Sequence, residues 1–212
     1  MEHRSTNHKR NTLNIIGATI SWFAVFGQLV LIILNRQAGV FETVIRFFSF
    51  FTILTNILVA CYFIAQLFSL KILRFLKTDT SLTAITAFIL VVGLVYQFVL
   101  RFIWEPSGWQ MVIDELLHTM IPSYVLLYWF FYVKFSSFNP RHLLTWLLYP
   151  FLYFAFVLLR GHFSGFYPYP FIDIQELGYS KVFINFIALS AFVLMLMGIL
   201  YVAARFLKKH ES

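Results

Sequence analysis

Residues 82–103 read LTAITAFILVVGLVYQFVLRFI, and within them only Arg101 is charged. A run of about 20 apolar residues is long enough for an α-helix to cross a bilayer. Other runs of this kind precede and follow it, and six helices are expected, at residues 13–34, 47–70, 82–103, 116–133, 143–159 and 182–207. None of the runs alternates as a strand does, and an open sheet edge cannot face lipid, so each is predicted to be a helix.

The composition of the whole chain agrees with this interpretation. Of its 212 residues 60% are apolar and 12% are charged, and the mean hydropathy is +0.80. A soluble domain is about one quarter charged, so the composition excludes a water-soluble enzyme, a nucleic-acid-binding module and a disordered chain. We expect an all-α polytopic membrane protein with six transmembrane helices in one domain, residues 1–212.

Basic residues are divided unequally between the two ends of the expected helices. Of 16 Lys and Arg, 11 fall in the segments at the end that carries both termini and 5 in the segments at the other end. Basic loops stay on the cytoplasmic side, so both termini are expected in the cytoplasm. The net charge of +7 is then explained by basic residues that fix the orientation of the helices in the membrane, and no nucleic-acid partner is expected. Short loops and the lack of a targeting peptide suit a bacterial inner membrane.

Polar residues concentrate in the outer halves of the expected helices, on the side away from the termini. They are Gln28, Ser49, Thr52, Thr55, Asn56, Gln97, Arg101, Asp114, Glu115, His118, Thr119, Ser123 and Asn185. Polar side chains in a membrane face the bundle interior or a wet cavity. The sequence therefore predicts a polar pocket that opens outward.

In the second expected helix, Ser49, Thr52 and Asn56 have i, i+3, i+7 spacing and form one polar stripe. A structural role is the simpler explanation, because hydroxyl side chains often bond to their own helix carbonyls and Asn joins helices. The chemical alternative is that a hydroxyl of this stripe is a nucleophile.

His118 is the residue that favours the chemical alternative. Asp114 and Glu115 precede it by four and three residues, so either carboxylate is placed to orient the imidazole. Along the helices Thr52 and His118 lie at similar depths, about 6–9 Å below the outer boundary. A hydroxyl and an oriented imidazole are the parts of an activated nucleophile. The alternative is a helix-end histidine that only packs.

A metal site is a competing interpretation. Glu115 and His118 have the Glu-x-x-His spacing of carboxylate-bridged metal sites, and His162, Asp173 and Glu176 are possible further ligands. A di-metal bundle needs a second such motif, which this chain lacks. Cys61 is the only cysteine, which excludes a cysteine cluster. We expect neither a metal nor another cofactor.

Three segments resemble a known family. They are His118-Thr-Met-Ile-Pro122, the fifth-loop stretches His162-Phe-Ser-Gly165 and Tyr169-Pro-Phe171, and Arg46-Phe-Phe-Ser-Phe-Phe-Thr52. They are similar to motifs of the androgen-induced and androgen-dependent multipass membrane hydrolases, which cleave fatty acid esters of hydroxy fatty acids with a threonine and a histidine. The chain looks closest to the short prokaryotic six-helix relatives of that group.

The resemblance implies His118 as the base and leaves two registers for the nucleophile. Alignment on the preceding aromatic residue selects Thr52, and alignment on the basic residue selects Ser49. The aspartate that follows the nucleophile in animal members has no acidic counterpart here, where Thr55 and Asn56 stand.

The expected function is therefore a lipid-ester hydrolase, or an acyl transferase of similar chemistry, in a pocket open to the outer leaflet. Side chains are expected to hold the oxyanion, because helical N–H groups are already bonded; the candidates are Asn56, Arg101 and His162. Tyr169 and Phe171 are expected to bind substrate at the rim of the pocket.

The expected ligand is a membrane lipid or fatty acid ester, and no obligate protein partner is expected. The alternative function is a non-enzymatic binding or transport protein, in which His118, Arg101 and the acidic residues line a vestibule. Pro122 and Pro150 fall inside apolar runs and are expected to kink them or to free a carbonyl.

Overall fold

The computed structural model describes residues 2–134 and 138–209, and all regular elements in these ranges are helical. In chain order they are α1 (Glu2–Leu34), α2 (Val40–Phe48), α3 (Phe51–Leu67), η1 (Lys71–Lys77), α4 (Asp79–Phe98), η2 (Leu100–Phe102), α5 (Trp109–Glu115), the π-helix η3 (Leu116–Met120), α6 (Ile121–Tyr132), α7 (Pro140–Thr145), α8 (Leu148–Ser164), η5 (Pro170–Ile172) and α9 (Ile174–Lys209). This confirms the all-α prediction for the described ranges. The expected domain also includes residues 1, 135–137 and 210–212, which lie outside them.

Four helical segments are long and apolar enough to cross a membrane: His8–Leu34, Asp79–Phe102, Arg141–Ser164 and Ile174–Leu207. A fifth crossing results if α2 and α3 count as one span, since together they are long and apolar enough, with a bend of 70° between them. These segments make the chain an integral membrane protein with four to five candidate spans among the described residues.

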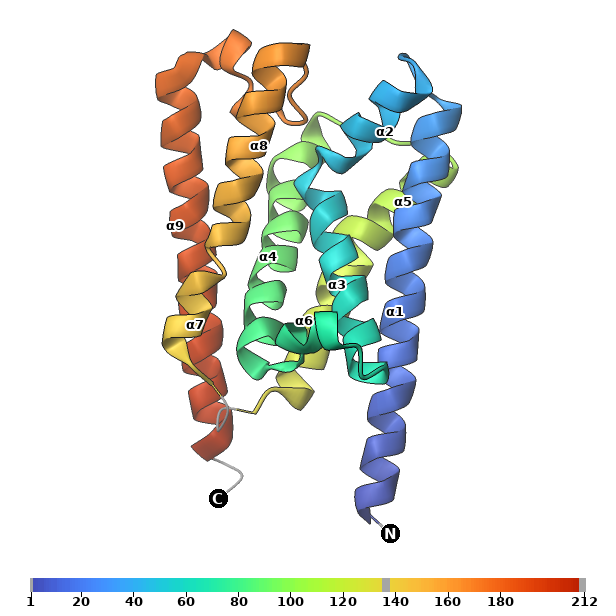
Figure 1. The fold of residues 1–212 in the computed structure, drawn as a ribbon, viewed down its shortest axis with the longest axis vertical. Helices are drawn as coiled ribbons and strands as arrows, with labels where there is room; N and C mark the ends of the chain where they lie inside the picture. Colours follow the sequence, from blue (N-terminus) through green and yellow to red (C-terminus); the bar gives the residue numbers. More distant parts are fainter. Residues whose placement is uncertain (1, 135–137, 210–212) are drawn as a thin grey trace.

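The long helices run side by side, and both chain termini lie at the same end of the bundle (Figure 1). α4 lies at the centre of the bundle. Of its most apolar 18-residue stretch 67% is buried, against 17% of the corresponding stretch of α9. α1 packs on α3, and α4 packs on α3, α6 and α9. The helices at the periphery therefore expose most of their surface.

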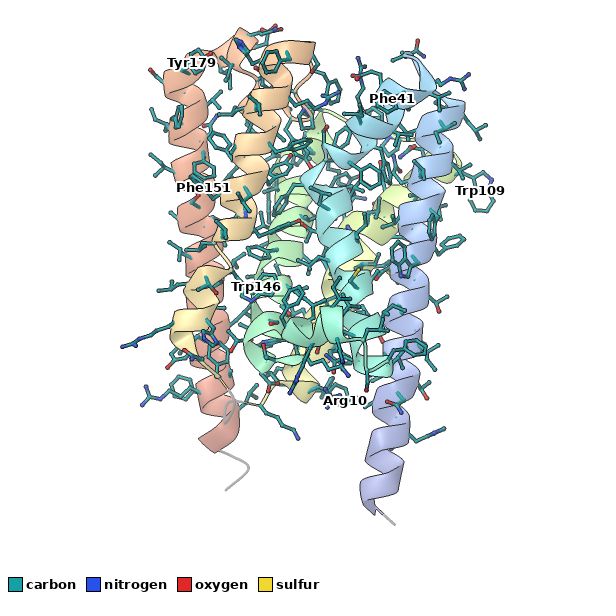
Figure 2. All side chains as sticks on the ribbon, viewed as in Figure 1. Arg10, Phe41, Trp109, Trp146, Phe151 and Tyr179 are labelled. Atoms are coloured by element: carbon teal, nitrogen blue, oxygen red, sulfur yellow. The ribbon has the colours of Figure 1, made fainter. Side chains whose placement is uncertain are left out.

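The exposed surface is itself apolar. Phe41, Trp109 and Phe151 are 81%, 71% and 56% exposed, and Figure 2 shows Trp109 directed outward from the bundle. Monomers in water rarely carry apolar surface this extensive. A bilayer supplies the apolar surroundings that such a surface needs.

Two of the predicted spans are broken, and a third contains a π-helical turn. The run 47–70 breaks at Ser49 and Phe50, where Phe50 is extended (φ −83°, ψ 126°). Residues 116–133 begin in the π-helix η3, which ends two residues before Pro122, and the helix extends back to Trp109 without a break. The run 143–159 breaks after Thr145, ahead of Pro150. The two proline effects were predicted, whereas the break at Ser49 has no proline or glycine to signal it.

Candidate active site

Thr52 lies at the second position of α3, directly after the break. At that position the backbone N–H has no helical carbonyl to bond, because the first four N–H groups of a helix are unpaired. It donates instead to the Tyr169 hydroxyl oxygen at 3.2 Å. The expectation that all helical N–H groups are occupied is therefore wrong here, because the span is broken next to the nucleophile candidate.

His118 lies in the π-helix η3 and faces Thr52. Its Nε2 atom is 3.4 Å from Thr52 Oγ1, and its Nδ1 atom is 2.9 Å from the backbone carbonyl of Asp114. Because a carbonyl only accepts, Nδ1 carries the proton of the neutral ring and Nε2 is left as an acceptor. The Tyr96 ring stacks on the imidazole at 4.1 Å with an interplanar angle of 13°. The imidazole is thus fixed in the orientation that a base for Thr52 requires.

Tyr169 is brought to Thr52 by the segment between α8 and α9. Its hydroxyl is 3.2 Å from Thr52 Oγ1, and its ring stacks on Phe171 at 5.1 Å. Burial raises the pKa of the Tyr169 phenol above its ordinary value, so the group stays protonated at neutral pH. When the Thr52 hydroxyl donates to His118 Nε2, the Tyr169 hydroxyl donates to Thr52 Oγ1. Each donor in this series of hydrogen bonds then has one acceptor.

Ser49 and Asn56 have structural partners. The buried Ser49 hydroxyl donates to the Ile45 carbonyl at 2.7 Å. Asn56 donates from Nδ2 to the carbonyls of Thr52, at 2.8 Å, and Leu117, at 3.4 Å, and so joins α3 to η3. Asn56 has no free N–H for an oxyanion, and this part of the prediction is wrong. Of the two hydroxyl candidates, only Thr52 adjoins His118.

The prediction that the Asp114 or Glu115 carboxylate orients the imidazole is wrong. Asp114 does so through its main-chain carbonyl, while its carboxylate accepts from Trp104 Nε1 at 2.6 Å and Gln110 Nε2 at 3.1 Å. Glu115 instead pairs with Arg101 at 2.5 Å and accepts from Thr119 at 2.7 Å. The helical rotation between neighbouring residues turns Glu115 away from the ring.

Arg101 and His162 do not reach the site. Arg101 is held by Glu115 and by Gln97 Oε1, at 2.5 Å, and does not line the cavity beside Thr52. His162 is exposed at the end of α8. Neither is placed as the expected oxyanion donor, because neither lines either of the cavities that Thr52 lines. Nor do the described residues contain a group of three or more His, Cys, Asp or Glu side chains that would hold a metal ion, so the ligands named for a metal site are not gathered.

Thr52 lies between two cavities. The outer cavity has a volume of about 540 Å³ and is lined by His118, Tyr96 and Asp114 and by the 35–38 connection, at the end of the bundle away from the termini (Figure 1). The side cavity has a volume of about 80 Å³ and is enclosed mainly by apolar side chains of α3, α4, α8 and α9, with Phe171 in its wall. Thr52, Leu100 and Tyr169 line both.

The sequence did not assign Tyr96, and it gave Tyr169 only a rim position. A Tyr-Pro-Phe segment in a loop carries no signal for a contact with a helix 117 residues away along the chain. The assembled group has a hydroxyl, an oriented imidazole acceptor, a helical N–H that is bonded to no backbone carbonyl and a phenol donor, which are the parts needed for acyl transfer. Comparison of the chain with protein-family models, with curated proteins and with solved structures finds no match.

Proposed function

We propose that this protein is a membrane-embedded lipid-ester hydrolase in which Thr52 is the nucleophile and His118 is the general base. The observation that carries the proposal is the 3.4 Å contact between Thr52 Oγ1 and His118 Nε2, with Nδ1 on a main-chain carbonyl. A hydroxyl needs an adjacent base to attack a carbonyl. Catalytic hydrogen bonds are often long before substrate binds, so this distance suits a resting site.

The reaction proceeds in two acyl transfers. Thr52 Oγ1 attacks the ester carbonyl carbon while His118 Nε2 accepts the hydroxyl proton. The tetrahedral intermediate collapses, the bond to the leaving alcohol breaks, and His118 returns the proton to the alcohol oxygen. A water molecule then attacks the acyl-Thr52 ester with His118 again accepting a proton, and collapse releases the fatty acid and restores the Thr52 hydroxyl.

The oxyanion is held by the Thr52 backbone N–H and the Tyr169 hydroxyl. In the resting site the N–H donates to the Tyr169 hydroxyl oxygen, and that hydroxyl donates to Thr52 Oγ1. As charge develops on the carbonyl oxygen of the substrate, both donors exchange these acceptors for it. The position at the start of α3 adds the positive end of the helix dipole. Donors of this kind lower the barrier by about 3–4 kcal/mol each.

The substrate class follows from the two cavities and from the resemblance to the hydroxy-fatty-acid ester hydrolases. An ester at Thr52 sends one apolar arm into the side cavity and the other into the outer cavity. This arrangement suits an ester in the interior of a long molecule better than one at its end. The proposal includes that the chain is a distant member of that family.

The proposed topology has six spans, with both termini in the cytoplasm of a bacterial cell and the outer cavity open to the outer leaflet. The sixth span is the helical stretch of α5, η3 and α6, which continues from Trp109 to Tyr132 without a break. The excess of Lys and Arg at the end that carries the termini supports this orientation.

The test is ester turnover by the purified full-length protein in detergent, with a fatty acid ester of a hydroxy fatty acid as substrate. We expect release of free fatty acid, and its loss in Thr52→Ala and His118→Gln. Mass spectrometry of peptides that contain Thr52 should detect the acyl adduct under rapid quenching. Transfer of the acyl group to an added alcohol rather than to water would identify an acyl transferase. Unchanged turnover in both variants would exclude the mechanism.

A further inference from the structure

The mouth of the outer cavity carries basic side chains that the proposed chemistry does not use. Arg36, Arg46 and Asp114 are the charged residues among those that line this cavity. Asp114 lies at the inner end next to His118, and both of its oxygens accept hydrogen bonds from Trp104 and Gln110. The two arginines lie at the outer end, so the cavity has a positive mouth.

Arg46 is held in place by its neighbours while most of its hydrogen-bonding capacity stays open. Its Nε donates to Glu42 at 2.8 Å, and its guanidinium lies 4.6 Å from the centre of the Phe166 ring. Within the described part of the chain, no hydrogen bond is made by the Nη1 or Nη2 atoms of Arg46. These two nitrogens carry up to four N–H donors, and the side chain is 34% exposed.

Glu42 does not neutralise this positive charge. The same Glu42 oxygen accepts from Arg160 Nη2 at 2.6 Å, and the Arg160 side chain is only 9% exposed. One carboxylate thus serves two guanidinium groups, and one positive charge remains. The guanidinium of Arg160 also lies 4.7 Å from the Phe166 ring, so Phe166 contacts both guanidinium groups, and of these three residues Arg46 and Phe166 line the cavity.

We propose that Arg46, together with Arg36 of the same cavity lining, binds the anionic head group of an amphiphile whose chain occupies the outer cavity. The head group is a carboxylate or a phosphate, because a guanidinium pairs with either through two parallel N–H bonds. An apolar tail would contact the apolar side chains in the rest of the lining, which are Leu31, Ile32, Phe47, Phe50, Ile53, Leu100 and Ile103.

The location of Arg46 relative to Thr52 gives this site a role in specificity, and to that extent the inference rests on the proposed function. Arg46 is near the end of α2 and Thr52 near the start of α3, on the two sides of the 70° bend, and both line the outer cavity. An acid held at Arg46 therefore presents to Thr52 an ester that lies several bonds further along the chain. The arm with the head group stays in the outer cavity, and the other acyl arm enters the side cavity.

The experiment measures binding without turnover. The full-length protein in nanodiscs of phosphatidylcholine is titrated with dibromostearic acid, at a pH where the acid is ionised, and with dibromostearamide, which is uncharged and is not an ester. Bromine quenches tryptophan fluorescence at short range, and Trp104 lines the cavity. Subtracting the signal of Trp104→Phe removes the quenching of tryptophans outside the cavity.

We expect the acid to bind more tightly than the amide, and Arg46→Gln to weaken the acid about tenfold or more while leaving the amide unchanged. Arg46→Lys keeps the charge without the two parallel N–H bonds, so its affinity for the acid should lie between those of the wild type and Arg46→Gln. The matched control is Lys181→Gln, which removes an exposed basic residue of α9 that does not line the cavity. Unchanged amide binding shows that the Arg46 variants keep the cavity intact.

The source of the head group is decided by a second pair of ligands, brominated phosphatidic acid and brominated phosphatidylcholine. Binding of either anion that depends on Arg46 supports the proposal and names the carboxylate or the phosphate. Equal binding of acid and amide to the wild type, or equal loss of both in Arg46→Gln, would overturn it. Thr52→Ala should keep full affinity for the acid, so that failure of the hydrolase mechanism and failure of this site give different results.

Discussion

At the scale of single residues, two hydroxyls three residues apart have different surroundings. Ser49 follows a helical turn and returns its hydrogen bond to the Ile45 carbonyl. Thr52 follows the break at Phe50 and bonds to Tyr169 and faces His118 instead. The sequence left both registers open because the two residue types have the same chemistry. Only their place relative to the break separates them.

Thr52→Ala is expected to reduce ester turnover by about 10³-fold or more, because loss of a nucleophile removes the covalent route. The measurement is the initial rate of fatty acid release at saturating substrate. Ser49→Ala is the matched control and should retain turnover to within a few-fold, with a loss of about 1 kcal/mol in unfolding free energy for one buried hydrogen bond. The opposite ranking of the two variants would assign the nucleophile to Ser49.

Tyr169→Phe removes one hydroxyl and leaves the ring in place on Phe171. We expect kcat to fall about a hundredfold if the phenol holds the oxyanion, with KM little changed. Because burial raises the pKa of Tyr169, the wild-type rate should show no decline from ionisation of this phenol below about pH 10. A rate that is equal in Tyr169→Phe and wild type would remove Tyr169 from the mechanism.

At the scale of elements, irregular turns position the site. The π-helix η3 ends at Met120, and Pro122 in the next turn has no N–H, so the Leu117 carbonyl accepts from Asn56 Nδ2 instead. Insertions of this kind often occur at functional sites. Here the π-turn carries His118, and α4 packs against it at Gly93, where an added Cβ would lie 3.0 Å from the His118 carbonyl and 3.2 Å from Pro122.

Gly93→Ala is expected to push η3 away from α4 by a few tenths of an ångström. Such overpacking costs about 1–3 kcal/mol, and turnover should fall because His118 moves relative to Thr52. The control is Gly198→Ala in α9, where nothing lies within 4 Å of the new methyl group. That variant should be neutral or stabilising by up to about 1 kcal/mol. Thermal unfolding and turnover of the two proteins give the comparison, and equal behaviour would contradict the close contact.

At the scale of the whole molecule, α2 and the start of α3 lie in the half of the bundle away from the chain termini (Figure 1). The outer cavity opens beside the 35–38 connection, whereas α1 starts and α9 ends at the other end. In the proposed topology, which places the termini in the cytoplasm, the ester would reach Thr52 from the outer leaflet.

Single cysteines test this orientation in a Cys61→Ala background, which removes the one natural thiol. In intact cells an impermeant maleimide should label Gln37→Cys and Ser107→Cys, and should label Asn11→Cys and Arg74→Cys only after lysis. Labelling of residues 74 and 107 from the same side would contradict a crossing by α4. Labelling of residue 11 in intact cells would reverse the proposed orientation.

The sequence by itself determined the helical class, the approximate helix positions and the effects of Pro122 and Pro150, because apolar run length and the missing proline N–H are local properties. It also selected the polar residues from which the site is built. Only the tertiary structure decided which of them meet. The break before α3, the turn of Glu115 away from His118, and the placement of Tyr169 on Thr52 depend on packing between segments distant in sequence, which no local pattern records.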